Sequence, residues 1–545
     1  MAGCWRPPLC LEKRLANSNE QEARRRMGEP YYITTAISYP NGKPHIGHAY
    51  EAIAADVIAR YKKAEAFDVR FQTGTDEHGL KMVQKARDVG QTPMELATEM
   101  SGYFKSMCDA LNIDYDVFIR TTEPRHHEAS QELWRRMEAN GDLYLDRYEG
   151  WYSVRDEAYY DESELIVGED GAKLSPQGTP VEWTVEETWF FRLSKYQDRL
   201  LELYGSSDFL RPESRRNEIA RFVEGGLRDL SVSRTSFDWG IKVPGSEGHV
   251  MYVWVDALTN YLTGLGFPDE TGDVARFWPA DLHLIGKDIV RFHAVYWPAF
   301  LMSAGLPIPK QVFGHGFLLN RGQKESKSLG NVTDPIGLAE TYGVDPLRYF
   351  LLREVAFGQD GSYSPEAIVT RANAELANSF GNLAQRSLSM IFKNMDGILK
   401  ADFPLSDADE ALFAAVDLGI AGLRRAFTDL AFSDGLEAWM RAVFACNQYV
   451  DEQAPWTLRK TDPVRMEAVL MTLFQAVRAL AIAVRPVVPT SIDALLDQMG
   501  VPANERVFAS LENPEWLVDL VASGFRIDKP VGVFPRLELP EEEVA

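Results

Sequence analysis

Apolar and polar residues follow two periodicities along the chain, that of a strand and that of a helix, and the changes between them mark the predicted elements. Residues 31–35 are all β-branched or aromatic, which indicates a strand, and Pro40-Asn41-Gly42 ends it with a turn. From Pro44 to Lys63 apolar residues recur at helical spacing, and Pro44 suits a first helical turn. This order predicts the phosphate-binding unit of an α/β nucleotide-binding fold.

The same two periodicities predict the elements that follow. Residues 69–74 are typical of a strand, and helices are expected at 80–89, 93–111 and 124–141. A further strand at 281–288 precedes a helix at 289–298, in which Ile289, His293 and Trp297 form one stripe. Long amphipathic stretches from 365 to 499 predict a helix bundle.

We therefore expect an α/β fold: a Rossmann-like nucleotide-binding domain split by a small α+β insertion and followed by an all-α bundle. A chain of 545 residues is too long for one core. The expected parts are a disordered tail (1–29), the first half of the nucleotide-binding domain (30–141), the insertion (142–249), the second half (250–334), a connector (335–364) and the bundle with its C-terminal tail (365–545).

Two short motifs carry candidate chemistry. His45-Ile46-Gly47-His48 places two imidazoles on one face of a helix start, beside unpaired N–H groups and the positive end of the helix dipole, and Gly47 leaves room for a base or ribose. Far along the chain, residues 322–331 (GQKESKSLGN) hold Lys324 and Lys327 between glycines, which indicates a loop able to close over phosphates. Each motif alone is better explained by an ordinary surface segment.

Together, HIGH and KESKS resemble the paired signature of class I aminoacyl-tRNA synthetases. The loop reads KESKS where KMSKS is commoner. Because Glu325 leaves both lysines in place, we expect altered loop dynamics and unchanged chemistry.

Three further stretches are similar to one family of this class, the methionyl-tRNA synthetases: 36–39 (AISY), 252–257 (YVWVDA) and 286–298 (GKDIVRFHAVYWP). The resemblance covers about residues 30–530. It implies that L-methionine is activated by Mg²⁺-bound ATP to methionyl-adenylate and then transferred to the 3′-terminal ribose of initiator and elongator methionine tRNA.

By the same resemblance, the insertion corresponds to the family's connective peptide domain, 335–364 to its stem-contact connector and the bundle to its anticodon-binding domain. Methionine is expected at Ile37, Tyr39, Asp76, Trp254, Ala257, Leu258, Tyr261, Ile289, His293 and Trp297. ATP is expected at His45, Gly47, His48, Glu51, Gly286, Asp288, His315 and Phe317, with His45, His48, Lys324 and Lys327 as the catalytic residues. Asn382, Arg386 and Trp456 are expected to read the anticodon. Asp76 follows the strand at 69–74, where it would take the substrate ammonium, cap helix 80–89, or do both.

Other functions predict other sequences. Leucyl, isoleucyl and valyl enzymes are expected to carry a much larger editing insertion, and a cysteinyl enzyme should show zinc ligands. A simpler HIGH nucleotidyltransferase would not need the bundle. A non-catalytic tRNA-binding relative remains the alternative, although it predicts eroded histidines or lysines and both sets are intact.

Composition adds limits. Cys4, Cys10, Cys108 and Cys446 lack C-x-x-C spacing, so we expect neither a disulfide framework nor the cysteine-liganded zinc of several relatives, and a reducing, cytoplasmic location. No apolar run long enough to span a bilayer is expected. A net charge of −23 opposes RNA binding, so local basic surface is required. Its candidates are Arg211, Arg215, Arg216, Arg221, Arg228 and Arg234, and a second group of Arg371, Arg386 and Lys393.

The ends of the chain carry two further expectations. Residues 1–29 are neither acid-poor nor apolar at their centre, so they do not fit a transit or signal peptide, and Met27 is an equally good start. The chain ends after an acidic stretch, 540–543, without the tRNA-binding domain that dimerises some relatives. We therefore expect a monomer that needs no protein partner.

Overall fold

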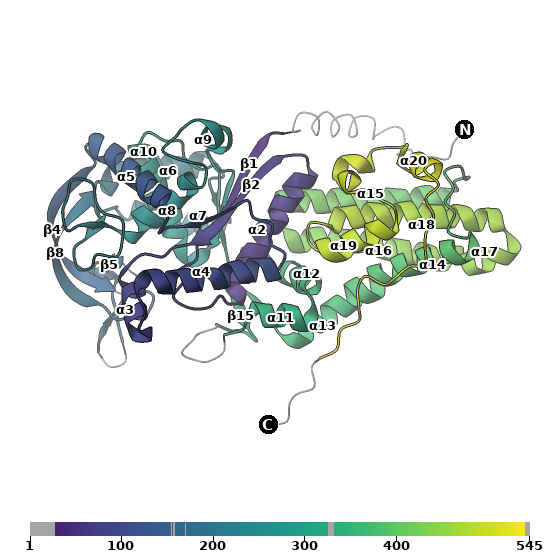
Figure 1. Ribbon diagram of the computed structural model, residues 1–545, viewed down its shortest axis with the longest axis horizontal. Helices are drawn as coiled ribbons and strands as arrows, with labels where there is room; N and C mark the ends of the chain where they lie inside the picture. Colours follow the sequence, from purple (N-terminus) through teal and green to yellow (C-terminus); the bar gives the residue numbers. More distant parts are fainter. Residues whose placement is uncertain (1–27, 154, 156–157, 169–170, 325–331, 540–545) are drawn as a thin grey trace, which may run out of the picture. The chain divides into compact units, whose positions relative to one another are not determined.

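The computed structural model describes residues 28–153, 155, 158–168, 171–324 and 332–539 (Figure 1). The chain divides into two compact units, each described by itself. The sheet unit comprises Pro30–Ala55 and Arg70–His315, and the helical unit comprises Asp56–Val69 and Gly316–Ala545 together with residues 1–29. The tail expected at the N-terminus lies outside the described residues up to residue 27.

A six-stranded sheet organises the sheet unit, in the order β3-β2-β1-β13-β14-β9. Its strands are β1 (Pro30–Thr35), β2 (Asp68–Thr75), β3 (Val117–Arg120), β9 (Leu210–Arg211), β13 (Leu282–Gly286) and β14 (Val312–His315). β1 and β13 pair in parallel with Ile33 opposite Leu282, and β13 and β14 do so with Leu284 opposite Phe313. From β1 the chain adds β2 and β3 on one side, and β13 and β14 lie on the other, so the order of the strands reverses between β1 and β13. Ligands of such sheets bind at the carboxyl ends of the strands at this point.

Helix α2 (Ile46–Ala64) starts two residues later than the sequence pattern predicts, so Pro44 lies before the helix. The helix starts at Ile46 because the backbone of His45 accepts its first hydrogen bonds, from His48 and Ala49.

Thr92 and Glu95 form a capping box that fixes the start of α4, as expected from Pro93. The helices of this unit are α3 (Leu80–Val89), α4 (Pro93–Ala110), α5 (Pro124–Ala139), α6 (Gln197–Ser206), α7 (Glu213–Glu224), α8 (Val253–Thr263), α9 (Gly272–Phe277) and α10 (Trp297–Ser303).

The segment after β13 is not the single α-helix that the sequence pattern predicts. It consists of a 3₁₀ turn, η3 (Lys287–Ile289), a π-helix, η4 (Phe292–Tyr296), and then α10. A π-helix has more residues per turn than an α-helix, so the i, i+4 stripe expected here does not apply. π-helical turns are often found at functional sites.

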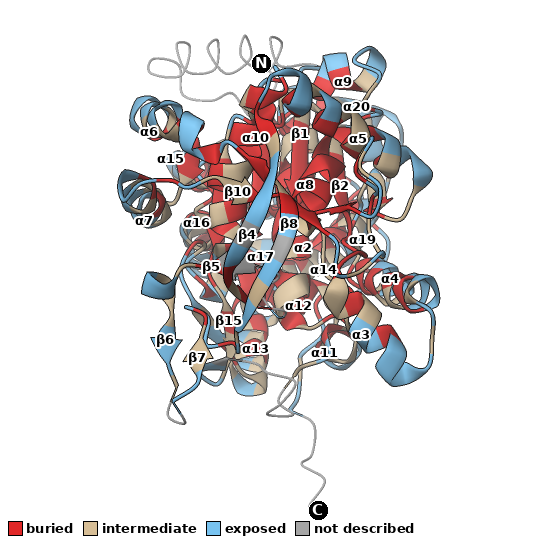
Figure 2. Ribbon diagram, turned by 90° about the vertical axis from the view of Figure 1, so that its left-hand side faces the viewer, coloured by how far each residue is buried: buried red, intermediate tan, exposed pale blue. Residues whose placement is uncertain are grey.

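The stretch expected to be an insertion contains a second, antiparallel sheet, β10-β8-β4-β5. Its strands are β4 (Leu143–Ser153), β5 (Ala158–Tyr160), β8 (Glu182–Phe191) and β10 (Leu230–Ser231), and two short pairs accompany it, β6 (Ile166–Val167) with β7 (Lys173–Leu174) and β11 (Ser233–Arg234) with β12 (Val250–Met251). Much of β4 and β8 is exposed, whereas β1 is buried (Figure 2). β9 also falls within this stretch but joins the parallel sheet beside β14. The boundaries of the insertion stay a prediction.

The helical unit confirms the predicted bundle. Its longest helices are α15 (Asp407–Thr428), α16 (Phe432–Gln453) and α18 (Pro463–Val484), and a small sheet of β16 (Gln323–Lys324), β15 (Leu318–Asn320) and β17 (Gly361–Tyr363) precedes them. The other elements are α11 (Pro335–Tyr342), α12 (Val344–Glu354), α13 (Pro365–Arg371), the π-helix η6 (Ala372–Gly381), α14 (Asn382–Asn394), α17 (Pro455–Thr461), α19 (Pro489–Gln498) and α20 (Trp516–Ala522).

Helix α18 corrects one expectation from the sequence. Among the described helices, it alone is long and apolar enough to cross a membrane, with a mean hydropathy of 1.7. The helix is 94% buried inside the structure over that window, and the core helix of a bundle passes the same test of length and composition. The sequence expectation that no such run exists is therefore wrong, and the run is a buried core helix.

Candidate functional site

The two signature histidines cap helix α2. His45 is the residue before the helix, and its Nδ1 accepts a hydrogen bond of 3.1 Å from the backbone N–H of Gly47. In return, Nδ1 of His48 accepts one of 3.1 Å from the backbone N–H of His45. The pair thus forms a reciprocal cap of the kind that Ser and Glu form in a capping box, and it satisfies two N–H groups of the first turn.

This cap determines which ring nitrogen carries the proton. A nitrogen that accepts a hydrogen bond is unprotonated, so each neutral ring of His45 and His48 carries its proton on Nε2. The ring centroids lie 3.9 Å apart. A Cβ on Gly47 would come within 2.9 Å of Cε1 of His45, so glycine here also makes room for the ring. The helix start therefore presents N–H donors suited to phosphate oxygens.

A second group of expected ATP residues lies at the ends of β13 and β14. Nε2 of His315 is 2.8 Å from Oε2 of Glu51, which α2 contributes one turn after His48. Burial raises the pKa of Glu51, the contact with His315 lowers it, and the nearby carboxylate of Asp288 raises it further. A Cβ on Gly286 would come within 2.6 Å of Oδ1 of Asp288, so only glycine admits this carboxylate. The structure thus brings Glu51, Gly286, Asp288 and His315 together.

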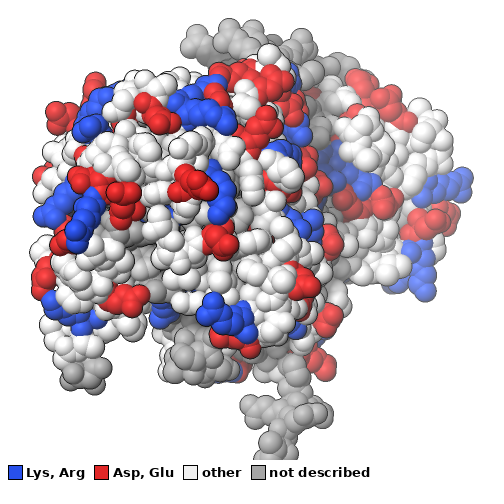
Figure 3. All heavy atoms as spheres, turned by 60° about the vertical axis from the view of Figure 1, so that its left-hand side comes forward, with Lys and Arg blue, Asp and Glu red and all other residues white. Residues whose placement is uncertain are grey.

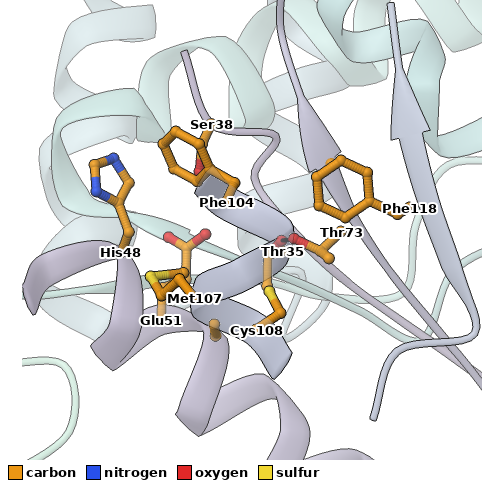
Figure 4. A pocket seen from close by; sticks show the side chains of 11 residues that line it. Thr35, Ser38, His48, Glu51, Thr73, Phe104, Met107, Cys108 and Phe118 are labelled. Carbon is orange, nitrogen blue, oxygen red and sulfur yellow. Dashed lines mark hydrogen bonds between the residues drawn. The ribbon is translucent and has the colours of Figure 1, made fainter. Parts of the chain in front are cut away.

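A small cavity lies beside His48 and Glu51 (Figure 4). Helix α4 supplies Phe104, Met107 and Cys108 to its wall. The ring of Phe104 meets that of His48 edge to face at 5.1 Å. This contact adds an aromatic neighbour to the His48 imidazole. Phe104 was not among the site residues expected from the sequence, because nothing in an amphipathic helix pattern separates it from a core residue.

Half of the expected methionine residues belong to one apolar cluster of the sheet unit or pack against it. That cluster includes Leu258, Tyr261 and Trp297, with Trp254 and Ile289 packed against it. The Tyr261 hydroxyl donates a hydrogen bond of 2.7 Å to Nε2 of His293, whose Nδ1 donates to the carbonyl of Ile289 at 2.9 Å. Burial lowers the pKa of His293 to about 4, so the ring is neutral. The expected wall of the methionine site is therefore uncharged and aromatic.

Tyr261 also connects this wall to two carboxylates. Burial raises its pKa well above the ordinary value, and the nearby charges of Glu51 and Asp76 raise it further. Asp76 itself is buried at the end of β2, and its N–H donates to the carbonyl of Ser38 at 2.9 Å. It does not cap α3, which begins after Gly79 without a side-chain cap, so the capping role is wrong. Asp76 instead lies close enough to Tyr261 for its charge to act on that hydroxyl, and its contact with the substrate ammonium stays a prediction.

One of the expected residues lies against another helix, and one aromatic partner was missed. The hydroxyl of Tyr39 accepts a hydrogen bond of 3.0 Å from the N–H of Met82, which places it against the start of α3. The neighbouring Ile37 is half-buried, and its place in the methionine site stays a prediction. Phe292, which the sequence did not single out, stacks on Trp254 with centroids 3.7 Å apart and an angle of 6°. The π-helix supplies both Phe292 and His293.

His283 is a second residue that sequence reasoning missed. It lies within β13, accepts a hydrogen bond of 3.3 Å from Nε1 of Trp297 and contacts Oγ1 of Thr34 at 2.7 Å. Its ring also stacks on Tyr261 at 4.1 Å. Burial lowers its pKa well below the ordinary value. A histidine in a buried strand was the available signal, since such a side chain needs polar partners.

The second motif belongs to the helical unit. Lys324 ends β16, where it pairs with Leu319 of β15. Phe317 lies just before β15, and its N–H donates to Oδ1 of Asp360 at 2.8 Å. Glu325 and Lys327 lie outside the described residues, so the expected roles of the KESKS lysines stay predictions.

The three residues expected to read the anticodon lie near one another in the helical unit. Asn382 begins α14, and Arg386 follows one turn later. The Arg386 guanidinium lies 5.7 Å from the centroid of the Trp456 ring and 3.5 Å from Oδ1 of Asp451. Trp456 is 48% exposed at the start of α17. An exposed tryptophan beside a cation is suited to stacking with an RNA base.

The basic clusters expected from the sequence are largely neutralised. Arg215 pairs with Glu218, Arg216 with Glu213 and Arg228 with Asp161. Arg234 is buried. On the face in Figure 3 acidic and basic side chains are interspersed. Positive charge is therefore not gathered into a broad patch there.

The described residues offer no candidate metal site. Within the part of the chain that the structure describes, no group of three or more His, Cys, Asp or Glu side chains is arranged to hold a metal ion. The expected lack of structural zinc stays a prediction.

Comparisons with known proteins agree with this geometry. Residues 31–388 match the family model of class I tRNA synthetases (M), and residues 401–544 match that of the anticodon binding domain of methionyl tRNA ligase. The chain is 57% identical to the methionine–tRNA ligase of Brucella suis biovar 1, covering 94% of this chain and 99% of that one. It is 55% identical to that of Mycobacterium tuberculosis (strain ATCC 25618 / H37Rv), with 94% and 99% covered.

A solved structure supports the same assignment. The crystal structure of Mycobacterium tuberculosis methionyl-tRNA synthetase bound by methionyl-adenylate superimposes with a TM-score of 0.88 at 54% identity, covering 93% of this chain and 100% of that one. The chain therefore belongs to the methionine–tRNA ligase family of the class I tRNA synthetases.

Proposed function

We propose that the chain is a methionine–tRNA ligase, which activates L-methionine with ATP and transfers it to methionine tRNA. One observation carries the proposal: the Tyr261 hydroxyl, which is hydrogen-bonded to the neutral His293, lies close enough to Asp76 and to Glu51, one turn after the HIGH motif, for their charges to raise its pKa. Relatives with 57% identity carry this name, and a solved relative holds methionyl-adenylate.

The pocket chemistry suits methionine. A thioether is polarizable and packs well against aromatic edges, which Tyr261 and Trp297 supply. His293 is neutral, so it places no charge beside the thioether, which could not pair with one. Asp76 would bind the substrate ammonium, leaving the carboxylate of methionine to face the helix start of α2.

The reaction needs no side-chain nucleophile. The methionine carboxylate attacks the α-phosphate of ATP, and pyrophosphate leaves with Mg²⁺, which enters as part of the substrate. The Nε2–H groups of His45 and His48 would stabilise charge on the phosphates in the transition state, as would Lys324 and Lys327. Glu51, Gly286, Asp288, His315 and Phe317 would bind the nucleotide. The 3′-terminal ribose of tRNA then attacks the adenylate, with Asn382, Arg386 and Trp456 binding the anticodon.

We further infer a cytoplasmic enzyme that acts as a monomer without a protein partner. The first part agrees with the burial of α18, which among the described helices is the only one apolar enough to cross a membrane. A sedimentation mass near twice 61.4 kDa would contradict the second.

Pyrophosphate exchange tests the proposal directly. Exchange of labelled pyrophosphate into ATP is measured with each of the twenty amino acids and without tRNA. We expect exchange with methionine alone. The Leu418→Ala variant, which changes a side chain 74% exposed in the helical unit, serves as the control and should exchange normally. Absence of exchange in folded protein would instead favour a non-catalytic tRNA-binding relative.

A further inference from the structure

A buried carboxylate with no assigned role lies beside the methionine pocket. Asp256 of α8 is completely buried, with Oδ2 2.6 Å from Nδ1 of His78 and Oδ1 2.8 Å from Nε2 of His126. Its contacts with the two imidazoles lower its pKa although burial opposes this, so Asp256 is ionised. Burying such a charge is unfavourable unless it is paired and hydrogen-bonded. An apolar residue would fill this place at lower cost if packing were its only role.

The positions of the partners indicate what the carboxylate does. His78 lies two residues after Asp76 in the loop that follows β2, and Asp256 lies two residues after Trp254 on α8. The same helix carries Ala257, Leu258 and Tyr261 of the proposed pocket. The hydrogen bond between His78 and Asp256 thus joins the element that holds the ammonium partner to the element that forms the pocket wall.

A second contact joins the same two elements on the other side of Asp76. The amide of Gln72, in β2, donates to Oδ1 of Asn260 at 2.6 Å and to its carbonyl at 3.0 Å. Asn260 lies one helical turn after Asp256, so both partners are on one face of α8. Asp76 therefore lies on a segment attached to α8 both before and after it.

The residue between Asp76 and His78 is attached differently. The carboxylate of Glu77 accepts hydrogen bonds from Nε and Nη2 of Arg120 at 2.7 and 3.0 Å, which ties the loop to the end of β3. Glu77 is as buried as Asp256, at 0% exposure for both. The loop thus takes part in two contacts of fully buried carboxylates: one between His78 and Asp256, which leads to the proposed pocket wall on α8, and one between Glu77 and Arg120, which leads away from it.

We propose that Asp256 and His78 are positioning residues that set the span between the Asp76 carboxylate and the pocket wall on α8. Methionine binds with its ammonium at one end of that span and its thioether along the wall, so the span determines which side-chain length fits. His126 supports Asp256 from α5, and its Nδ1 lies 2.9 Å from Oγ1 of Thr263, at the end of α8. This inference rests on the proposed function.

The test compares methionine with ethionine, whose side chain is one methylene longer. Steady-state pyrophosphate exchange is measured for the wild-type chain and for Asp256→Asn, His78→Ala, His78→Asn and Glu77→Gln. We expect Asp256→Asn and His78→Ala to raise the KM for methionine 10- to 100-fold, to change the KM for ATP less than threefold and to reduce the preference for methionine over ethionine. The amide of His78→Asn retains a donor at the Nδ1 position, so its parameters should stay within about threefold of wild type.

Glu77→Gln is the matched control, since it also removes a buried carboxylate charge but leaves both residues of the Asp256–His78 contact in place. It should lower thermal stability without changing the ratio of methionine to ethionine. The inference is overturned if Asp256→Asn and Glu77→Gln change the ratio equally, or if neither changes it, because the Asp256 pair would then serve stability alone. If Asp256→Asn does not fold, His78→Ala and His78→Asn test the inference instead: it is supported if only His78→Ala reduces the preference for methionine over ethionine, and overturned if the two variants behave alike. Absence of exchange in the wild-type chain would contradict the proposed function itself, before any variant is compared.

Discussion

His45 combines two roles that a single substitution can separate. Its Nδ1 caps α2, while its Nε2–H is the donor proposed to act on ATP. Asparagine is a good N-cap residue, so His45→Asn should keep the cap, whereas His45→Ala should lose about 1 kcal/mol of stability. Both variants should lower the rate of adenylate formation by about 100-fold or more, which corresponds to the loss of one transition-state donor.

Rapid-quench measurement of adenylate formation and thermal unfolding together check this prediction. The two variants should agree in rate and differ in midpoint. An unchanged rate in His45→Asn would show that the Nε2–H donor takes no part in the mechanism. Equal unfolding midpoints of the two variants would show that Nδ1 of His45 does not stabilise α2 as a cap.

His293 gives a prediction about pH. Its pKa is lowered from 6.5 to about 4 by burial, so the neutral ring that accepts from Tyr261 persists from pH 8 down to about pH 5. A group with a depressed pKa becomes protonated only as the pH approaches that lower value. Methionine affinity, followed by tryptophan fluorescence, should therefore be constant within about twofold between pH 8 and 6. A decline centred near pH 6.5 that disappears in His293→Gln would contradict the assignment.

At the level of elements, two helices of the bundle approach so closely that they need a glycine. A Cβ on Gly419 of α15 would lie 2.6 Å from Cβ of Ala442 and 3.0 Å from the carbonyl oxygen of Ala438, both on α16. Alanine would improve helix propensity by about 1 kcal/mol, but overpacking against backbone costs about 1–3 kcal/mol. Gly419→Ala should therefore lower the unfolding midpoint of the helical unit and spare methionine-dependent exchange.

A matched control exists in α4. A Cβ on Gly102 would meet no atom within 4 Å, so Gly102→Ala should raise stability or leave it unchanged. Differential scanning calorimetry of the two variants measures both effects. If both glycine variants were stabilised alike, α15 and α16 would not be packed as described.

The elements also show which features sequence patterns predict. Helix 80–89 and the strand at 69–74 follow from local periodicity, and the structure places them within one residue of the expected bounds. The π-helix was missed because a 3.6-residue pattern cannot distinguish one additional residue per turn. Asp256 and His283 were missed for a different reason. Asp256 contacts His126 and His283 contacts Thr34, each 130 or more residues away in the chain, and only the fold brings these pairs together.

For the whole molecule, charge restricts how RNA can bind. The chain carries a net charge of −23, and many arginines of the expected basic cluster are paired with glutamate or aspartate. Contacts with the phosphate backbone supply most sequence-independent affinity for nucleic acids. Because that contribution is small here, discrimination between tRNAs should depend mainly on contacts with bases, and unrelated RNA should compete poorly.

Trp456 allows this to be tested. It is half exposed beside Arg386, and stacking of a base on an aromatic side chain contributes about 1–3 kcal/mol. Trp456→Ala should therefore raise the KM for methionine tRNA by about 10- to 100-fold in aminoacylation while leaving tRNA-independent pyrophosphate exchange unchanged. Leu418→Ala removes a still more exposed side chain from the same unit and should change neither activity. Equal losses in the two variants would show that general disturbance of the helical unit, rather than base stacking, limits tRNA charging.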